Sequence, residues 1–144
     1  MITDKLRDLI KSFEGLKLTV YLDMAYHKTV GYGHKDDSMT LGDTVTQAQA
    51  DALLDKDIQT AIDQTTRLIK VDLNQNQLDA LTDFTYNLGC TRLQDSTLLK
   101  FVNGGGSDDE IKAEFLKWDH SGGVTVSGLL RRRQMEVDLF FSES

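Results

Sequence analysis

The sequence is poor in proline, cysteine and long apolar runs, and each of these absences excludes some classes of protein. It has no proline and only one cysteine, Cys90, among 144 residues. One cysteine cannot form an internal disulfide, so the fold must depend on a hydrophobic core. No apolar run approaches the roughly 18 residues of a membrane span. The first residues, MITDKLRDLIKSFEG, lack the features of a signal peptide. We therefore expect one compact domain, with no stable membrane insertion and no export of its own.

Positive charge is also scarce, with 16 Lys and Arg against 23 Asp and Glu and a formal net charge of −7. This balance argues against a nucleic-acid partner, because binding to phosphates needs a basic face. The three consecutive arginines 131–133 do not change that expectation, because on a helix they point to different sides. His27, His34 and His120 are scattered and lack the spacing of a zinc pair. We predict neither a metal nor another cofactor.

Helical periodicity covers most of the chain. Apolar residues recur at helical spacing in segments with polar capping residues or terminal glycines, which predicts helices over 2–12, 46–69, 74–88, 96–102, 107–118 and 129–141. The pattern over 46–69 is longer than an average helix. It fits either one long connecting helix or two helices broken near 55–57.

One segment near the N-terminus follows a different period. Leu16, Leu18, Val20 and Leu22 alternate with polar residues, which predicts a strand. A second strand-like stretch over 29–34 contains two glycines, which often mark a bulge or a close approach of the backbone. The chain is thus predicted to be a mostly helical α+β protein with a small antiparallel sheet inserted after its first helix.

Two acids flank this strand and suggest chemistry. Glu14 lies where the first helix should end, beside an apolar wall that would favour its protonated form. Asp23 lies in a turn with polar neighbours and should stay ionised. Carboxyl groups in two such unlike environments are typical of glycosidic bond cleavage. Spacing alone is a weak signal among 23 acids, because most acids are simply exposed.

The residues around these acids are more specific. Glu14-Gly15, then Asp23 after eight intervening residues, Thr29 after five more, and the sequence GYGH at 31–34 resemble the signature of the phage-type lysozymes of glycoside hydrolase family 24. Later segments are similar to that family as well, namely QNQLDALTDFTYNLG, STLLKFVNGG, FLKWDHSGG and GLLRRRQMEVDLF. The resemblance covers nearly the whole chain.

The resemblance implies a fold and a division of roles. It implies a single lysozyme-like domain over 1–144. A sheet lobe of about 14–45 would pack against a helical lobe of about 1–13 and 46–144, with the active-site cleft between them. Glu14 would protonate the leaving oxygen. Asp23 would position a water or stabilise the oxocarbenium-like transition state, and Thr29 would help to hold that water. In family terms the reaction inverts the anomeric centre.

Two further residues are predicted to help bind the substrate. The family usually has glycine three residues after the aspartate, where this chain has Tyr26. Tyr26 must either adopt a left-handed conformation or force a different turn, and its ring could then lie along the sugar groove. The resemblance also implies that at least one of the three arginines turns inward to a carboxylate near the cleft, and we predict Arg132 as a partner of Glu14.

The resulting hypothesis is an endolysin that hydrolyses the β-1,4 bond between N-acetylmuramic acid and N-acetylglucosamine in peptidoglycan and so lyses the host. It would be a monomer held in the host cytoplasm until a separate holin lets it reach the periplasm and wall. Two alternatives remain open: a lytic transglycosylase, which needs no water-positioning partner, and an inactive lysozyme-like domain that only binds glycan or a protein.

Overall fold

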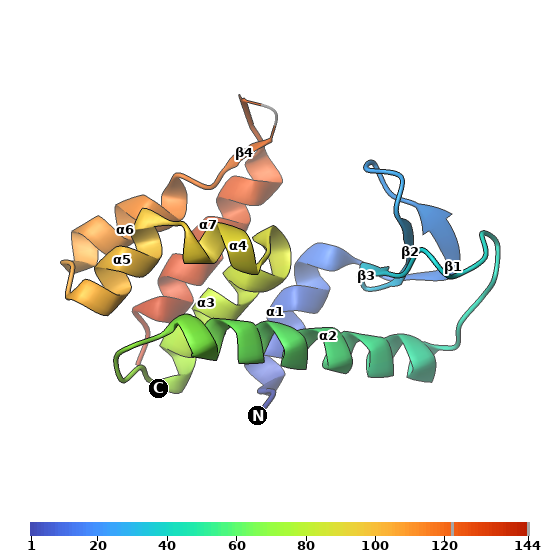
Figure 1. The fold of residues 1–144 in the computed structure, drawn as a ribbon, viewed down its shortest axis with the longest axis horizontal. Helices are drawn as coiled ribbons and strands as arrows, with labels where there is room; N and C mark the ends of the chain where they lie inside the picture. Colours follow the sequence, from blue (N-terminus) through green and yellow to red (C-terminus); the bar gives the residue numbers. More distant parts are fainter. Residues whose placement is uncertain (122, 144) are drawn as a thin grey trace. The chain divides into compact units, whose positions relative to one another are not determined.

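The structure is a computed structural model that describes residues 1–121 and 123–143 (Figure 1). Within these residues the helices are α1 (Asp4–Glu14), α2 (Gln47–Leu68), α3 (Gln75–Leu88), α4 (Cys90–Gln94), α5 (Thr97–Gly104), α6 (Asp108–Leu116) and α7 (Ser127–Phe140). The strands are β1 (Lys17–Leu22), β2 (Lys28–Gly31), β3 (His34–Lys35), β4 (His120–Ser121) and β5 (Val124–Thr125). The predicted fold class, mostly helical with a small sheet after the first helix, is confirmed. In the described part of the chain no helix is both long and apolar enough to cross a membrane.

The chain divides into two compact units, Met1–Gln59 and Thr60–Ser144. We call them the N-terminal and the C-terminal unit. The N-terminal unit contains α1 together with β1, β2 and β3, whereas the sequence resemblance assigned residues 1–13 to the helical lobe. The single two-lobed domain stays a prediction.

Helix α1 places Glu14 at its end. The Thr3 hydroxyl caps the start by accepting the N–H of Leu6 at 3.1 Å. Gly15, with φ +68°, ends the helix while its N–H donates to the Lys11 carbonyl. The helix therefore runs two residues beyond the predicted end near residue 12, and Glu14 is its last residue.

The three-stranded sheet is antiparallel in the order β1-β2-β3. Tyr21 lies opposite Thr29, and Thr29 lies opposite Lys35, so these three residues form one row across the sheet. An irregularity in β1 between Lys17 and Tyr21 breaks the regular register. Of the alternating apolar residues only Val20 is buried, and the leucines at 16, 18 and 22 are 38 to 45% exposed. The alternation of apolar and polar residues correctly predicted the strand, but most of the apolar face of that strand is exposed.

Helix α2 is one continuous helix of 22 residues, which settles the alternative left by the sequence. Its N-terminal part packs on the sheet, because Gly31 lies so close to Ala50 that a Cβ added to the glycine would be 3.5 Å from the Cβ of Ala50, in ordinary van der Waals contact. Polar contacts add to this packing. Arg7 of α1 donates two hydrogen bonds to the Asp55 carboxylate, and His34 of β3 lies 2.8 Å from Asp57.

In the C-terminal unit, α3 to α7 surround an apolar core. Its buried members include Leu81, Phe84, Leu98, Phe115 and Phe140. The predicted capping boxes that begin α3 and α6 are both present. Trp118 packs edge-to-face on Phe84 with ring centroids 5.6 Å apart. Helix α4 and the β4–β5 hairpin were not predicted from the sequence, and Gly122 of the predicted family segment lies outside the described residues.

Candidate active site

Glu14 and the sheet meet at Gly33. A Cβ atom added to Gly33 would lie 3.0 Å from Oε2 of Glu14, which is closer than almost any real Cβ contact. Gly33 also has φ +85°, a conformation that favours glycine. The half-buried Glu14 side chain therefore lies directly against the turn between β2 and β3. The close backbone approach predicted from the glycine pattern is confirmed at this point.

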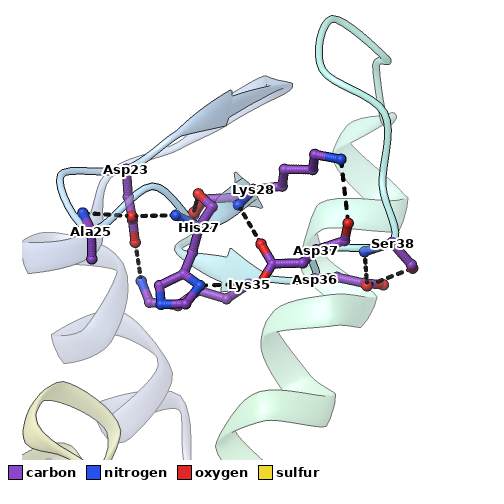
Figure 2. A network of polar contacts seen from close by, with 9 residues as sticks. Asp23, Ala25, His27, Lys28, Lys35, Asp36, Asp37 and Ser38 are labelled. Carbon is purple, nitrogen blue, oxygen red and sulfur yellow. Dashed lines mark hydrogen bonds and ion pairs between the residues drawn. The ribbon is translucent and has the colours of Figure 1, made fainter.

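Asp23 follows β1 and is held by a dense set of hydrogen bonds (Figure 2). Its Oδ1 accepts the backbone N–H groups of Ala25 at 2.9 Å and His27 at 2.8 Å. Its Oδ2 lies 2.9 Å from the Lys35 ammonium group, and the side chain is 17% exposed. The hydrogen bond from Lys35, followed by that from the His27 backbone, lowers the pKa of Asp23 to about 2. The expectation of an ionised aspartate agrees with this environment.

Thr29 lies in the middle of the row that crosses the sheet. It is 1% exposed, and its hydroxyl donates to the His27 carbonyl at 2.9 Å. The hydroxyl hydrogen is thus committed, while the oxygen lone pairs can still accept a hydrogen bond. His27 therefore links the two predicted residues, because its N–H binds Asp23 and its carbonyl binds Thr29.

Tyr26 has φ +64°. Among the described residues it is the one non-glycine residue with a positive φ. Of the two turns that the sequence allowed, the left-handed one is therefore correct. The ring is 81% exposed, so it adds little to the core. The hydrogen bond from the Tyr26 N–H to the Asp23 carbonyl, 3.0 Å long, closes the turn in spite of the strained residue.

Arg132 is buried on α7 in the C-terminal unit. Its guanidinium group binds both carboxylate oxygens of Asp83 on α3, at 2.8 and 2.9 Å. Arg133 is also fully buried and lies 2.8 Å from Glu136, whereas Arg131 is exposed. Arg132 and Arg133 therefore both turn inward to carboxylates of the C-terminal unit, and the implied place of such a pair near the cleft stays a prediction. The pairing of Arg132 with Glu14 stays a prediction.

Sequence reasoning missed two residues with important contacts. Lys35 reaches Asp23 from the far strand of the sheet, and Asp83 binds Arg132 from another helix. Neither has a local sequence signal. Lys35 becomes visible only when the strand register places it opposite Thr29.

In the N-terminal unit, then, an ionised carboxylate, a buried hydroxyl and a glutamate at a helix end are supported by one small sheet. These are the groups that hydrolysis of a glycosidic bond needs. The arrangement defines a candidate glycosidase site.

Comparison with known proteins gives the family. The family model described as phage lysozyme matches residues 11–136. An endolysin of Acyrthosiphon pisum secondary endosymbiont phage 1 is 41% identical over 98% of this chain and 98% of its own length. The solved structure of the muramidase domain of SpmX from Asticaccaulis excentricus has a TM-score of 0.90 at 33% identity, and the match covers 99% of each chain. The chain belongs to the phage lysozyme family.

Relatives differ in length. The endolysin of Bacillus phage B103 is 41% identical over 94% of this chain, but the match covers 52% of that protein. The chain thus spans about half the length of some of the curated relatives that it matches.

Proposed function

We propose that this protein is an endolysin that hydrolyses the β-1,4 glycosidic bond between N-acetylmuramic acid and N-acetylglucosamine in bacterial peptidoglycan. Membership in the phage lysozyme family supports this activity. The observation that carries it furthest is the environment of Asp23, which is ionised and rigidly bound next to the buried Thr29. The same sheet carries the glycine against which Glu14 rests.

The residues would share the reaction as follows. Glu14 protonates the leaving glycosidic oxygen. The negative charge of Asp23 stabilises the oxocarbenium-like transition state or positions the attacking water. The Thr29 oxygen accepts a hydrogen bond from that water, because its own hydroxyl hydrogen is donated to the His27 carbonyl. Inversion at the anomeric carbon requires that this water attack from the face opposite the leaving group.

Two contacts with the substrate belong to the same proposal. The exposed Tyr26 ring, three residues after Asp23, lies along the sugar groove, where an aromatic face can pack on a sugar. Arg132 supports the site from α7 as a partner of Glu14. Its bidentate pair with Asp83 would keep the guanidinium group in one orientation for that contact.

Glu14→Gln is the variant that tests the function. Its amide cannot donate the proton of a general acid, so the rate of lysis of outer-membrane-permeabilised cells should fall by about 10²–10⁴-fold. Glu143→Gln, at an exposed position, is the matched control and should keep the wild-type rate. A Glu14→Gln protein with a rate near wild type would overturn the assignment.

Mass spectrometry of the digested glycan separates hydrolysis from the other reaction. Reducing N-acetylmuramic acid ends support hydrolysis, whereas anhydro ends would mean a lytic transglycosylase. A wild-type protein that binds glycan without any lysis would instead be an inactive binding domain.

The route to the wall is a further part of the proposal. The family resemblance supports a monomer that accumulates in the host cytoplasm and depends on a separate holin to reach the periplasm and wall.

A further inference from the structure

Lys35 reaches the candidate site from the strand farthest from Asp23 in the sheet. It lies directly opposite Thr29, which in turn lies opposite Tyr21. Residues directly opposite each other in an antiparallel sheet present their side chains on the same face. Lys35 therefore extends along the face that carries Thr29, and its ammonium group lies 2.9 Å from Oδ2 of Asp23.

The two oxygens of Asp23 are held in different ways. Oδ1 is bound by two backbone N–H groups of its own turn, from Ala25 and His27. Oδ2 is bound by a side chain, that of Lys35. Removing the Lys35 charge should therefore release one oxygen and leave the other in place, which lets the two contributions be separated by experiment.

The neighbouring acids have partners of their own, as Figure 2 shows. Asp36 accepts the backbone N–H and the hydroxyl of Ser38 at 3.0 and 2.6 Å. Asp37 accepts the Lys28 N–H and lies 3.2 Å from the His27 ring. The Lys35 ammonium group is thus committed to Asp23, although two acids directly follow it in the chain.

We propose that Lys35 is a positioning residue of the active site, whose ammonium group fixes Oδ2 of Asp23 in one orientation during turnover. The inference rests on the proposed hydrolase function. The charged and titratable groups that face this contact are Lys35 from β3 and His27 from the turn, whose ring lies 3.2 Å from Asp37; Glu14 from α1 lies against Gly33, two residues before Lys35.

The contact favours one of the two roles considered for Asp23. A carboxylate whose pKa is lowered to about 2 is a weak base, so it is poorly suited to take a proton from water at neutral pH. It remains a full negative charge close to the reacting sugar. Electrostatic stabilisation of the transition state, with the proton of the attacking water passing to solvent, is therefore the role of Asp23 that this contact favours, and Lys35 holds the carboxylate in place for it.

The experiment compares Lys35→Met, which keeps the length of the side chain without its charge, with Lys35→Arg, which restores the charge. Lys28→Met is the control, because the Lys28 ammonium group donates to the Asp37 carbonyl and not to Asp23. The Asp23 carboxyl is titrated by carbon-13 NMR, with Asp23→Asn to assign its signal. kcat and KM are measured from pH 3.5 to 7.

In Lys35→Met the pKa of Asp23 should rise from about 2 toward 3.8, without reaching it, because the backbone hydrogen bonds remain. The acid limb of the rate profile should move up with it. kcat at pH 7 should fall at constant KM, and Lys35→Arg should restore each value. Lys28→Met should match the wild type.

An unchanged Asp23 titration in Lys35→Met would overturn the contact. A shifted titration with unchanged kcat and pH profile would overturn the positioning role. A wild type without lytic activity would instead count against the hydrolase function, which the NMR titration does not measure, so the two failures are distinguishable.

Discussion

Gly33 lies so close to Glu14 that a side chain at this position would displace the glutamate. A Cβ at this position would meet Oε2 of Glu14 at 3.0 Å. Gly42 has nearly the same backbone conformation, with φ +87° against +85°, but no atom lies within 4 Å of its added Cβ. The two glycines therefore separate the effect of backbone strain from the effect of displacing the glutamate.

We expect Gly33→Ala and Gly42→Ala each to lower the free energy of unfolding by about 1–2 kcal/mol, because both force alanine into the left-handed region. Only Gly33→Ala should also lower kcat, since only there must Glu14 move. Urea unfolding measures the first effect and lysis of permeabilised cells the second. Equal loss of kcat in both variants would mean that strain in the N-terminal unit, and not the contact with Glu14, limits the rate.

How far single residues could be predicted depends on whether their signal is local. Glu14, Asp23 and Thr29 could be proposed as site residues because the family signature that they resemble is a short, local stretch of the sequence. The left-handed conformation of Tyr26 followed as one of two options from a missing glycine. Lys35 could not be predicted, because its role depends on strand register, and β3 is only two residues long.

Between α3 and α7, two carboxyl groups and two guanidinium groups are buried together. Arg132 binds Asp83, and Arg133 lies 2.8 Å from Glu136 and 5.1 Å from the Phe84 ring. Burial raises the pKa of Glu136 well above its ordinary value, and its hydrogen bond to Asp83 adds to the rise. Burial alone would also raise the pKa of Asp83, but hydrogen bonds from Glu136 and Arg132 outweigh it and leave that pKa lowered. The raised pKa favours the protonated form of Glu136, which can donate a hydrogen bond to Asp83.

This arrangement predicts how stability depends on pH. A carboxyl group with a raised pKa in the folded state contributes stability below its unfolded pKa, and that stability is lost as pH rises through the folded pKa. Glu136→Gln keeps a neutral donor at all pH values. Relative to wild type, it should therefore become progressively more stable as the pH rises above about 4.5. Wild type and Glu136→Gln both contain Asp83, so its contribution to the pH dependence of stability cancels in the comparison.

Urea unfolding at several pH values measures this difference, with Glu143→Gln at an exposed position as the control that should track the wild type. If the free energy of unfolding changes with pH in the same way for wild type and Glu136→Gln, then Glu136 is ionised in the folded protein.

At the level of elements, the sequence predicted the long helices well because capping residues and periodicity agree there. Asn74 and Ser107, for example, begin α3 and α6 with full capping boxes. Boundaries and short elements were harder to predict. Helix α4 has five residues and no side-chain cap, and β4 and β5 have two residues each, too few for a period to be visible. The leucines of β1 are partly exposed although they alternate with polar residues, because burial depends on what covers the strand and alternation does not report that.

For the whole molecule, the net charge of −7 bears on how the protein meets its substrate. A bacterial envelope is itself anionic, so long-range electrostatics should not draw this protein to the outer surface of a cell. Access to peptidoglycan should then depend on delivery and not on attraction. This agrees with the proposed route, in which another protein opens the way from the cytoplasm.

We expect that expression of this chain in Escherichia coli without a holin leaves the culture density rising, because the proposed route keeps the protein on the cytoplasmic side of the membrane, away from the wall. Co-expression of a pore-forming holin, or addition of chloroform, should cause lysis within minutes. Glu14→Gln expressed to the same level should not lyse under either treatment, which separates enzymatic lysis from damage by the pore itself. Rapid lysis by the wild type alone would show that the chain reaches the wall by a route of its own and would refute the dependence on a holin.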